Sequence, residues 1–309
     1  MSGPGADLVR RLQAVDGVTV EPGASLRAHT TLKVGGPAAA LVTAETLDGL
    51  VEVAHVCAAR ATPVLVLGKG SNLLVADSGF PGIVLTLGRA FRSVEVDGEQ
   101  VVAGAAEPMP ILARAVAREG LGGLAFGVAV PGSLGGAVRM NAGAHGAELR
   151  DVLEWVEAVR FADHGRVQRF AAGDLAMSYR HTALPPDAVV IRAGLRLRRA
   201  DAAELAGEMA EMKRWRREHQ PVNEPSCGSV FRNPPGDSAG RLVEAAGLKG
   251  HRVGGAAISS RHANFITTEP GATAADVWRL IQDARTAVQA AFGVDLQTEV
   301  VLVGFEDPA

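Results

Sequence analysis

Apolar positions along the chain recur with two spacings, and together they predict an alternation of helices and strands. In residues 47–60 the apolar side chains fall on one helical face, which is typical of a helix packed against a core. Residues 63–67 and 83–87 are short continuous apolar runs, which are typical of buried strands. The pattern therefore predicts a small α/β region over residues 1–86.

A second region is expected over residues 87–199. It begins with strand-like residues 93–105 and continues with a helix over 111–118. Beyond a glycine-rich stretch, two longer apolar segments at 153–161 and 188–197 are predicted to be strands.

The third region, residues 200–293, has a different pattern. A long amphipathic helix over 200–219 is predicted to end at Gln220, because a residue before proline avoids the α conformation. Thr273 and Asp276 form a variant of the capping box at the start of another helix. The remaining predicted elements are a helix over 239–246, a strand over 264–267, a helix over 273–292 and a closing strand over 294–303. The fold class is therefore expected to be α+β, in three parts.

Composition and charge narrow the classes of function. Hydrophobic residues make up 47% of the 309 residues and the net charge is −3, which gives non-specific nucleic-acid binding little electrostatic support. Four arginines recur at 192, 196, 198 and 199 between apolar positions, which indicates the solvated face of a strand. The two cysteines, Cys57 and Cys227, lie outside any CxxC spacing, so a disulfide framework or zinc site is not expected and a reducing compartment fits.

Residues 121–138 carry no charge, a length that resembles a membrane span. However, this window contains six glycines and Pro131, so it is expected to form buried turns around a ligand. The N-terminal residues lack the apolar core of a signal peptide. The sequence therefore predicts a cytoplasmic protein without membrane insertion.

Two glycine-rich segments are candidates for phosphate binding, because glycine allows backbone N–H groups to converge on an anion. They are residues 68–72, directly after the predicted strand 63–67, and residues 131–146. Neither is a Rossmann fingerprint, and the formal match at 120–125 follows a helix where a strand is required. The alternative is that these glycines only form tight turns. The longer stretch also contains Ser133, Asn141 and His145, which favours a ligand site.

Nine short segments, in order along nearly the whole chain, resemble the bacterial UDP-N-acetylenolpyruvoylglucosamine reductases, also called UDP-N-acetylmuramate dehydrogenases. They are residues 31–37, 68–74, 131–146, 178–180, 220–221, 227–234, 246–250, 262–265 and Glu299. The resemblance implies a flavoprotein fold of the vanillyl-alcohol-oxidase type, in which two α/β regions hold FAD and a third binds substrate. The closing strand would return to the first region.

The resemblance also implies which residues bind FAD. They are Gly68, Lys69, Gly70, Ser71, Asn72, Leu73, Pro131, Gly132, Ser133, Gly135, Gly136, Asn141, Gly143 and Ala144. No metal is expected. The shorter form of the family is indicated, because little chain separates Arg180 from Ser229 and Tyr179 is the only tyrosine. Thr182 and the pair Ala256-Ala257 depart from the family pattern, which bears on details of substrate contact.

The implied reaction is the reduction of the enolpyruvyl ether of a UDP-sugar, with NADPH as reducing co-substrate. Arg180 would bind the substrate carboxylate, since a guanidinium can bind both oxygens; its alternative role is an ion pair. Ser229 would donate the proton, held close by its neighbour Gly228. Glu299 would orient the carboxylate, or would be a solvated strand residue. Cys227 is expected to be a packing residue.

Further substrate contacts are implied at Tyr179, Arg216, Arg217, Gly228 and Asn233. The arginines at the end of the long helix have a local alternative, because cations are favoured at a helix C-terminus. His262 and Asn264 are expected to have structural roles. Two other functions stay open: a flavin-dependent sugar or alcohol oxidase, in which His145 could be attached to flavin, and a non-catalytic nucleotide-binding module. A monomer is expected.

Overall fold

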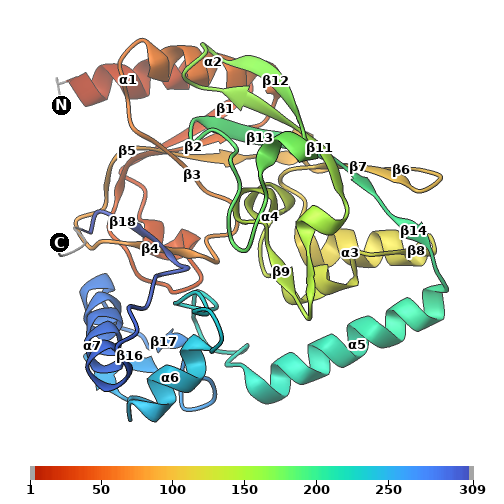
Figure 1. The fold of residues 1–309 in the computed structure, drawn as a ribbon. Coiled ribbons are helices and arrows are strands. Elements are labelled where there is room, and N and C mark those ends of the chain that lie inside the picture. The colour runs from red at the N-terminus through yellow and green to blue at the C-terminus, as the bar shows by residue number, and fades with distance from the viewer. Residues whose placement is uncertain (1–3, 306–309) are drawn as a thin grey trace. The chain divides into compact units, whose positions relative to one another are not determined.

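The computed structural model describes residues 4–305 (Figure 1), which form two compact units. The first unit contains the residues up to Gly23, Ala39–Gly68 and Gly82–Arg214. The second contains Ala24–Ala38, Lys69–Pro81 and the residues from Trp215 onward. The boundaries at 86/87 and 199/200 divide the chain differently and stay a prediction.

The first unit contains a four-stranded sheet of order β1-β2-β5-β3, in which β1 and β2 are antiparallel and β3 and β5 are parallel. The elements of this part are α1 (Pro4–Gln13), β1 (Val18–Pro22), β2 (Ala38–Ala44), α2 (Leu47–Ala58), β3 (Val64–Val66) and β5 (Phe80–Leu87). The predicted helix and both predicted strands are therefore confirmed. Helix α2 buries Leu50, Val53, Ala54 and Cys57 in a core shared with β2 and β5.

The first unit also contains an antiparallel five-stranded sheet of order β12-β11-β13-β7-β6. Its strands are β6 (Val94–Asp97), β7 (Gln100–Gly104), β11 (Leu153–Arg160), β12 (Arg166–Ala171) and β13 (Ala188–Arg196). On the solvated face Arg192 pairs with Glu157 and Arg196 with Glu154, as the alternation predicts. Helix α3 (Met109–Arg118) and the short pair β8 (Leu121–Gly122) and β14 (Arg198–Arg199) complete this part.

The uncharged window between Leu121 and Val138 folds into buried turns and helical segments within the core of the first unit. It contains the start of α4 (Leu134–Met140), a helix that the sequence pattern does not predict. The hairpin β9 (Gly143–Ala144) and β10 (Ala147–Glu148) follows it. Within the described residues 4–305, no helix is long and apolar enough to cross a membrane.

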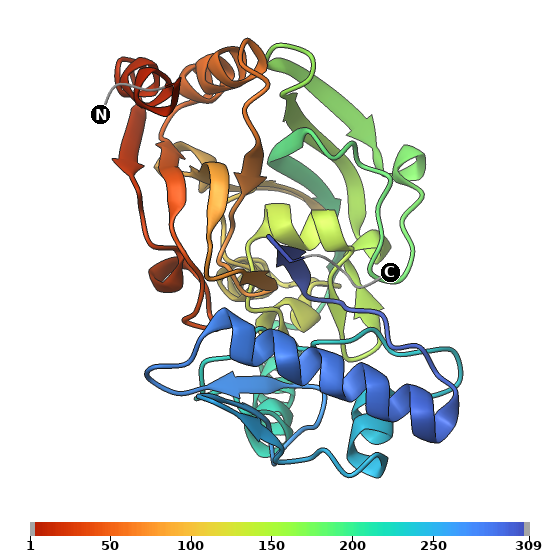
Figure 2. The ribbon, with the colours of Figure 1, turned by 90° about the vertical axis from the view of Figure 1, so that its left-hand side faces the viewer.

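The second unit is built around a three-stranded antiparallel sheet with α7 packed against it (Figure 2). Its elements are β4 (Leu73–Val75), α6 (Ala239–Ala245), β15 (Arg252–Val253), β16 (Ala256–Ile258), β17 (Ile266–Thr268), α7 (Ala274–Phe292) and β18 (Val301–Val303). Thr273 and Asp276 form the predicted capping box of α7. Strand β18 pairs in parallel with β4, which lies within residues 1–86.

Two predicted elements differ from the structure. The closing strand is limited to β18, because residues 297–300 instead bond to the loop around Val230. Helix α5 (Ala202–His219) starts near the predicted position, but it buries only Leu205 and Met209, so most of its surface is exposed. The predicted helix is nevertheless confirmed, and its buried and half-buried residues Leu205, Met209, Met212 and Arg216 recur at the spacing of one helical face, as in an amphipathic helix. Strand β17 begins at Ile266, two residues later than predicted.

Candidate active site

The loop Gly68–Leu73 connects β3 to β4, and its backbone is suited to binding an anion. Gly70 has a positive φ of 61°, and a Cβ there would lie 2.1 Å from the His29 carbonyl oxygen, so only glycine fits. Thr31 fixes the loop by donating its backbone N–H and its hydroxyl to the Gly70 carbonyl, at 3.0 and 3.2 Å. Among residues 4–305, no acceptor pairs with the N–H groups of Gly70, Ser71 and Asn72, which remain available to a phosphate.

The Asn72 side chain connects this loop to the end of the chain. Its Nδ2 donates to the Glu299 carbonyl at 3.0 Å, and its own carbonyl accepts from Val301 N–H at 3.1 Å. The loop predicted to bind cofactor and the predicted substrate residue Glu299 are therefore held together. The sequence could not show this role of Asn72, because the partners are 227 positions apart.

The stretch 131–146 is closely packed. Leu134 and Gly135 donate their N–H groups to the carbonyls of Glu107 and Ala105, both at 2.9 Å, so these amides are not available to a ligand. A Cβ at Gly68 would lie 2.7 Å from Ser133 Oγ, so the Ser133 side chain would have to move to admit a larger residue there. The interpretation that backbone N–H groups bind a phosphate is thus better supported at residues 68–72. The glycines of residues 131–146 mainly permit close packing.

Asn141 is fully buried at the end of α4, in the left-handed conformation with φ 41°. Its Nδ2 donates to Glu148 Oε2 at 3.0 Å and to the Ser178 carbonyl at 2.9 Å, and its Oδ1 accepts from Arg150 N–H at 3.0 Å. These three bonds fix the end of α4 against the residues that follow it.

Tyr179 and Arg180 form the tip of a tight hairpin in the first unit. Ser178 and His181 exchange two backbone hydrogen bonds, of 3.1 and 3.0 Å, and Arg180 has a positive φ of 52°. The Arg180 guanidinium is half-buried; its Nη2 donates to the Gly143 carbonyl at 3.1 Å, and it lies 4.9 Å from the centre of the Tyr179 ring. The structure therefore brings Arg180 into contact with Gly143, one of the predicted FAD-binding residues.

Ser229 and Glu299 lie on neighbouring segments of the second unit. The Val230 carbonyl accepts from Glu299 N–H at 2.8 Å, and Asn264 fixes Phe231 by two side-chain bonds of 2.9 Å each. Val230 and Val300 are buried, whereas Ser229 and Glu299 are half-buried. Arg180 belongs to the first unit, so its position is described only within that unit.

Cys227 does not have the properties of a nucleophile. The thiol is buried, and burial, with a smaller contribution from the charge of Glu299, raises its pKa to about 12. It packs in the core of the second unit, which agrees with the predicted packing role. Gly228 has a positive φ of 76°, so the turn that presents Ser229 favours glycine.

The other predicted substrate residues lie in the second unit, at the end of α5 and in the loop before α6. Arg216 donates from Nε to Gln220 Oε1 at 2.9 Å, and burial lowers its pKa. The carbonyl of Arg217 accepts from Arg261 at 2.7 Å. Asn233 is exposed, and its Oδ1 accepts from Ala239 N–H at 3.1 Å. These contacts leave each substrate role a prediction.

The departures from the family pattern have simple structural consequences. Thr182 uses its hydroxyl to accept from Leu184 N–H at 3.3 Å, a bond that serine could also make. Ala256 is fully buried, while Ala257 is half-buried and lines a cavity of about 680 Å³ in the second unit. His262 is partly buried, and burial lowers its pKa; its Nδ1 accepts from Asn264 N–H at 3.2 Å. Within the described part of the chain, no group of three or more His, Cys, Asp or Glu residues could hold a metal ion.

Comparison with known proteins places the whole chain in one group. Residues 38–171 match the FAD binding domain, and residues 220–303 match the C-terminal domain of UDP-N-acetylenolpyruvoylglucosamine reductase. The match to the FAD binding domain confirms the predicted flavoprotein fold and the predicted FAD cofactor.

Full-length relatives agree. A UDP-N-acetylenolpyruvoylglucosamine reductase from Heliobacterium modesticaldum is 45% identical over 89% of this chain and 88% of its own. A second such reductase, from Anaeromyxobacter, is 43% identical over 98% of this chain and 95% of its own. The crystal structure of the reductase from Thermus caldophilus has a TM-score of 0.80 and 39% identity, covering 93% of this chain and 98% of that one. The chain therefore belongs to the UDP-N-acetylenolpyruvoylglucosamine reductase family.

Proposed function

We propose that this chain is an FAD enzyme that uses NADPH to reduce UDP-N-acetylglucosamine enolpyruvate to UDP-N-acetylmuramate, a step in peptidoglycan precursor synthesis. The names of the relatives support this reductase over an oxidase or a non-catalytic module. The observation that supports the proposed site is the backbone bond from Glu299 N–H to the Val230 carbonyl, which joins the segment of the candidate proton donor Ser229 to the segment of Glu299.

Two segments would hold FAD. The loop Gly68–Leu73 would bind the diphosphate through its open backbone amides, and residues 131–146 would supply a closely packed surface. In this second segment Pro131 and Gly136 are exposed, while Gly132, Gly135, Gly143 and Ala144 are half-buried. When bound, FAD supplies the hydride that is added to the enolpyruvyl methylene carbon.

The protein residues would stabilise charge and deliver a proton. Hydride addition leaves negative charge on the carbon beside the carboxylate, and the Arg180 guanidinium would stabilise it through that carboxylate. Ser229 would then protonate this carbon. A serine hydroxyl is a weak acid, so its position must be fixed, and the bonds from Asn264 to Phe231 and from Glu299 to Val230 fix the segment that carries it.

The setting of the enzyme is part of the same proposal. The protein is expected to act in the cytoplasm as a monomer, and to bind the UDP-sugar and NADPH but no nucleic acid or membrane. Elution as a single 32.0 kDa species in size-exclusion chromatography would support the monomer.

Replacing Ser229 tests the proton donor. In Ser229→Ala the flavin should still be bleached by NADPH at the wild-type rate, because the first half-reaction needs no proton on substrate carbon. Reoxidation by the enolpyruvyl substrate should slow by about 10²- to 10⁴-fold, the usual loss of a general acid. Stopped-flow absorbance of the flavin measures both rates.

The matched control is Ser226→Ala, which removes a hydroxyl three residues upstream in the same segment. It should reoxidise like the wild type. Reoxidation of Ser229→Ala within twofold of wild type would remove Ser229 from the mechanism. A wild-type protein that is reduced by NADPH but not reoxidised by the enolpyruvyl ether would refute the proposed substrate.

A further inference from the structure

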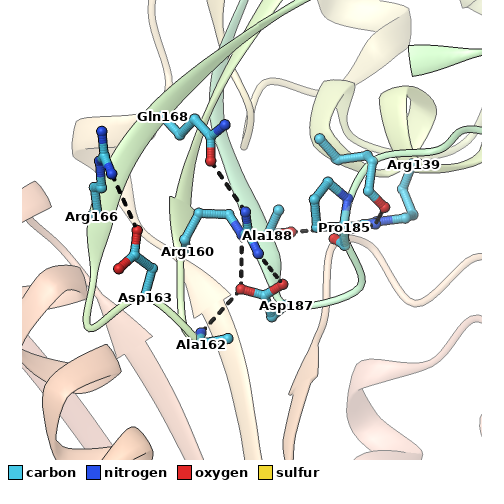
Figure 3. A network of polar contacts seen from close by, with 10 residues as sticks. Arg139, Arg160, Ala162, Asp163, Arg166, Gln168, Pro185, Asp187 and Ala188 are labelled. Carbon is cyan, nitrogen blue, oxygen red and sulfur yellow. Dashed lines mark hydrogen bonds and ion pairs between the residues drawn. The ribbon is translucent and has the colours of Figure 1, made fainter. Parts of the chain in front are cut away.

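Arg139 lies in α4, within the glycine-rich stretch, and has no role in the mechanism above. Its guanidinium contacts the backbone of one distant turn (Figure 3). Nη1 donates to the carbonyls of Leu184 and Pro185, at 2.8 and 2.9 Å, and Nη2 donates to the carbonyl of Ala188. One side chain therefore holds three carbonyls of a single turn.

The same turn is also fixed through the carboxylate of Asp187, one of its own residues. Arg160 on β11 binds this carboxylate through Nε and Nη2, at 2.8 and 2.9 Å, and Ala162 N–H donates to it at 3.0 Å. In Figure 3, Arg139 and Arg160 approach the turn from different elements. Its position is thus determined jointly by α4 and by the five-stranded sheet.

In the chain, the turn comes directly after the hairpin that carries Arg180. The hairpin closes with a 2.7 Å bond from Ala183 N–H to the Leu175 carbonyl, and Leu175 and Leu184 are both buried. The exit of the hairpin is therefore fixed where Arg139 holds Leu184 and Pro185.

Two further contacts join the tip of the hairpin to the glycine-rich stretch. Asn141 donates to the Ser178 carbonyl at 2.9 Å, and Arg180 donates to the Gly143 carbonyl at 3.1 Å. Arg139, Asn141 and Gly143 lie within five positions of one another in the sequence. One short segment therefore contacts the hairpin at its exit and at its tip.

The contacts of Arg139 require a guanidinium. Its planar group presents five N–H donors in a fixed geometry, whereas lysine presents three donors on one atom and cannot span three carbonyls in the same way. All three of these hydrogen bonds go to backbone carbonyls, so the residue is explained by the geometry of its donors. Burial lowers its pKa, and the charge of Asp187 acts in the opposite direction.

We propose that Arg139 is a positioning residue for Arg180, which couples the segment that binds FAD to the arginine that binds the substrate carboxylate. The proposal rests on the proposed function, since it assigns Arg180 the role described there. Arg139 itself touches neither substrate nor reacting atoms.

The test is Arg139→Lys, which keeps the charge but not the geometry, with Arg139→Met as a second variant. Both should retain FAD and be bleached by NADPH within about twofold of the wild-type rate. Reoxidation by substrate should slow by about 10- to 100-fold, because small displacements of a catalytic group cost this much. Arg180→Ala shows how much the reoxidation rate falls when the Arg180 side chain is lost completely. In the Arg139 variants the KM for the enolpyruvyl substrate should rise, while the KM for NADPH should stay unchanged.

The matched control is Arg166→Lys, because Arg166 is exposed and forms a loose pair with Asp163 at 3.7 Å. It should leave both half-reactions unchanged. Hydrogen exchange of the folded holoenzyme should show faster exchange at Ser178 and His181 in the Arg139 variants only.

Three outcomes would overturn the proposal. They are wild-type reoxidation by Arg139→Lys, equal slowing of both half-reactions, or unchanged exchange at the hairpin in a folded variant. If Arg139→Lys does not fold with FAD bound, the same two half-reaction rates and the hydrogen exchange at Ser178 and His181 are measured in Arg139→Met. If the wild type itself is not reoxidised by the enolpyruvyl ether, the proposed function fails, whereas the exchange result still decides whether Arg139 positions the hairpin.

Discussion

At the scale of single residues, the asparagines of the two glycine-rich segments serve to hold backbone. Asn72 bonds to the carbonyl of Glu299, and Asn141 bonds to the carbonyl of Ser178 and to Glu148. An amide side chain carries both a donor and an acceptor, so it can connect two segments without a buried charge. Each of these asparagines joins a predicted FAD-binding segment to the segment of a predicted catalytic residue.

The Asp187–Arg160 pair gives a prediction at the same scale. The bond from Arg160 lowers the pKa of Asp187, so this carboxylate stabilises the folded state at pH values above its unfolded pKa of about 3.9. That contribution, about 1 kcal/mol after solvent screening, is lost as the pH falls through the lower folded pKa. Asp187→Asn should therefore be less stable than the wild type at pH 7, and this difference should begin to shrink as the pH falls below about 4.

Thermal unfolding between pH 7 and pH 3 measures how this difference changes. Asp163→Asn is the control, because its pair with Arg166 is exposed. Curves for the wild type and Asp187→Asn that run parallel over the whole range would contradict the assignment.

At the scale of elements, the start of α7 combines a local and a distant cap. Thr273 and Asp276 form the capping box that the sequence predicts. Asp77 also accepts from the N–H groups of Ala274 and Ala275, both at 2.9 Å, across almost two hundred positions. A carboxylate at this end is favoured by the unpaired N–H groups and by the helix dipole.

Removing this distant cap should destabilise the protein. Asp77→Ala is expected to lower the free energy of unfolding by about 1 kcal/mol, as for the loss of other N-caps. Urea unfolding followed by circular dichroism measures the change. Asp16→Ala, at an exposed position of the first unit, is the control and should have no measurable effect. A loss no greater than in this control would show that Thr273 alone caps the helix.

At the scale of the whole molecule, the two units are interleaved along the chain, since Ala24–Ala38 and Lys69–Pro81 belong to the second unit. A ligand that binds only the folded state stabilises it by mass action.

Removal of FAD should therefore lower the unfolding temperature. At 100-fold excess over Kd, bound ligand contributes about 2.7 kcal/mol, which corresponds to a shift of about 5 °C in a chain of this size. Scanning fluorimetry of the flavin-free protein, titrated with FAD, measures this shift. Riboflavin, which lacks the diphosphate, is the matched ligand and should have little effect. Equal shifts from both would exclude a diphosphate site in the loop Gly68–Leu73.

Much of this fold could be predicted from the local spacing of apolar and polar residues. Helices α2 and α7, the capping box at Thr273 and the strands β3, β5, β11 and β13 of the first unit depend on spacing over a few residues, so the sequence predicts them. The glycine segments indicated a phosphate site, because glycine allows backbone N–H groups to converge on an anion, and the resemblance implied the flavoprotein. The chemistry of Arg180, Ser229 and Glu299 was implied by resemblance, and stays a prediction.

The tertiary structure decided the contacts that join distant segments. The closing strand is short because residues 297–300 bond to Val230 and Arg232, and the Arg139 contacts, the Asn72–Glu299 bond and the Asp77 cap span from 45 to 227 positions. A hydrogen bond between segments so far apart leaves no periodicity in either one. The sequence alone therefore determined the strongly periodic elements and the glycine motifs, whereas the folded chain determined which residues hold the candidate catalytic side chains in place.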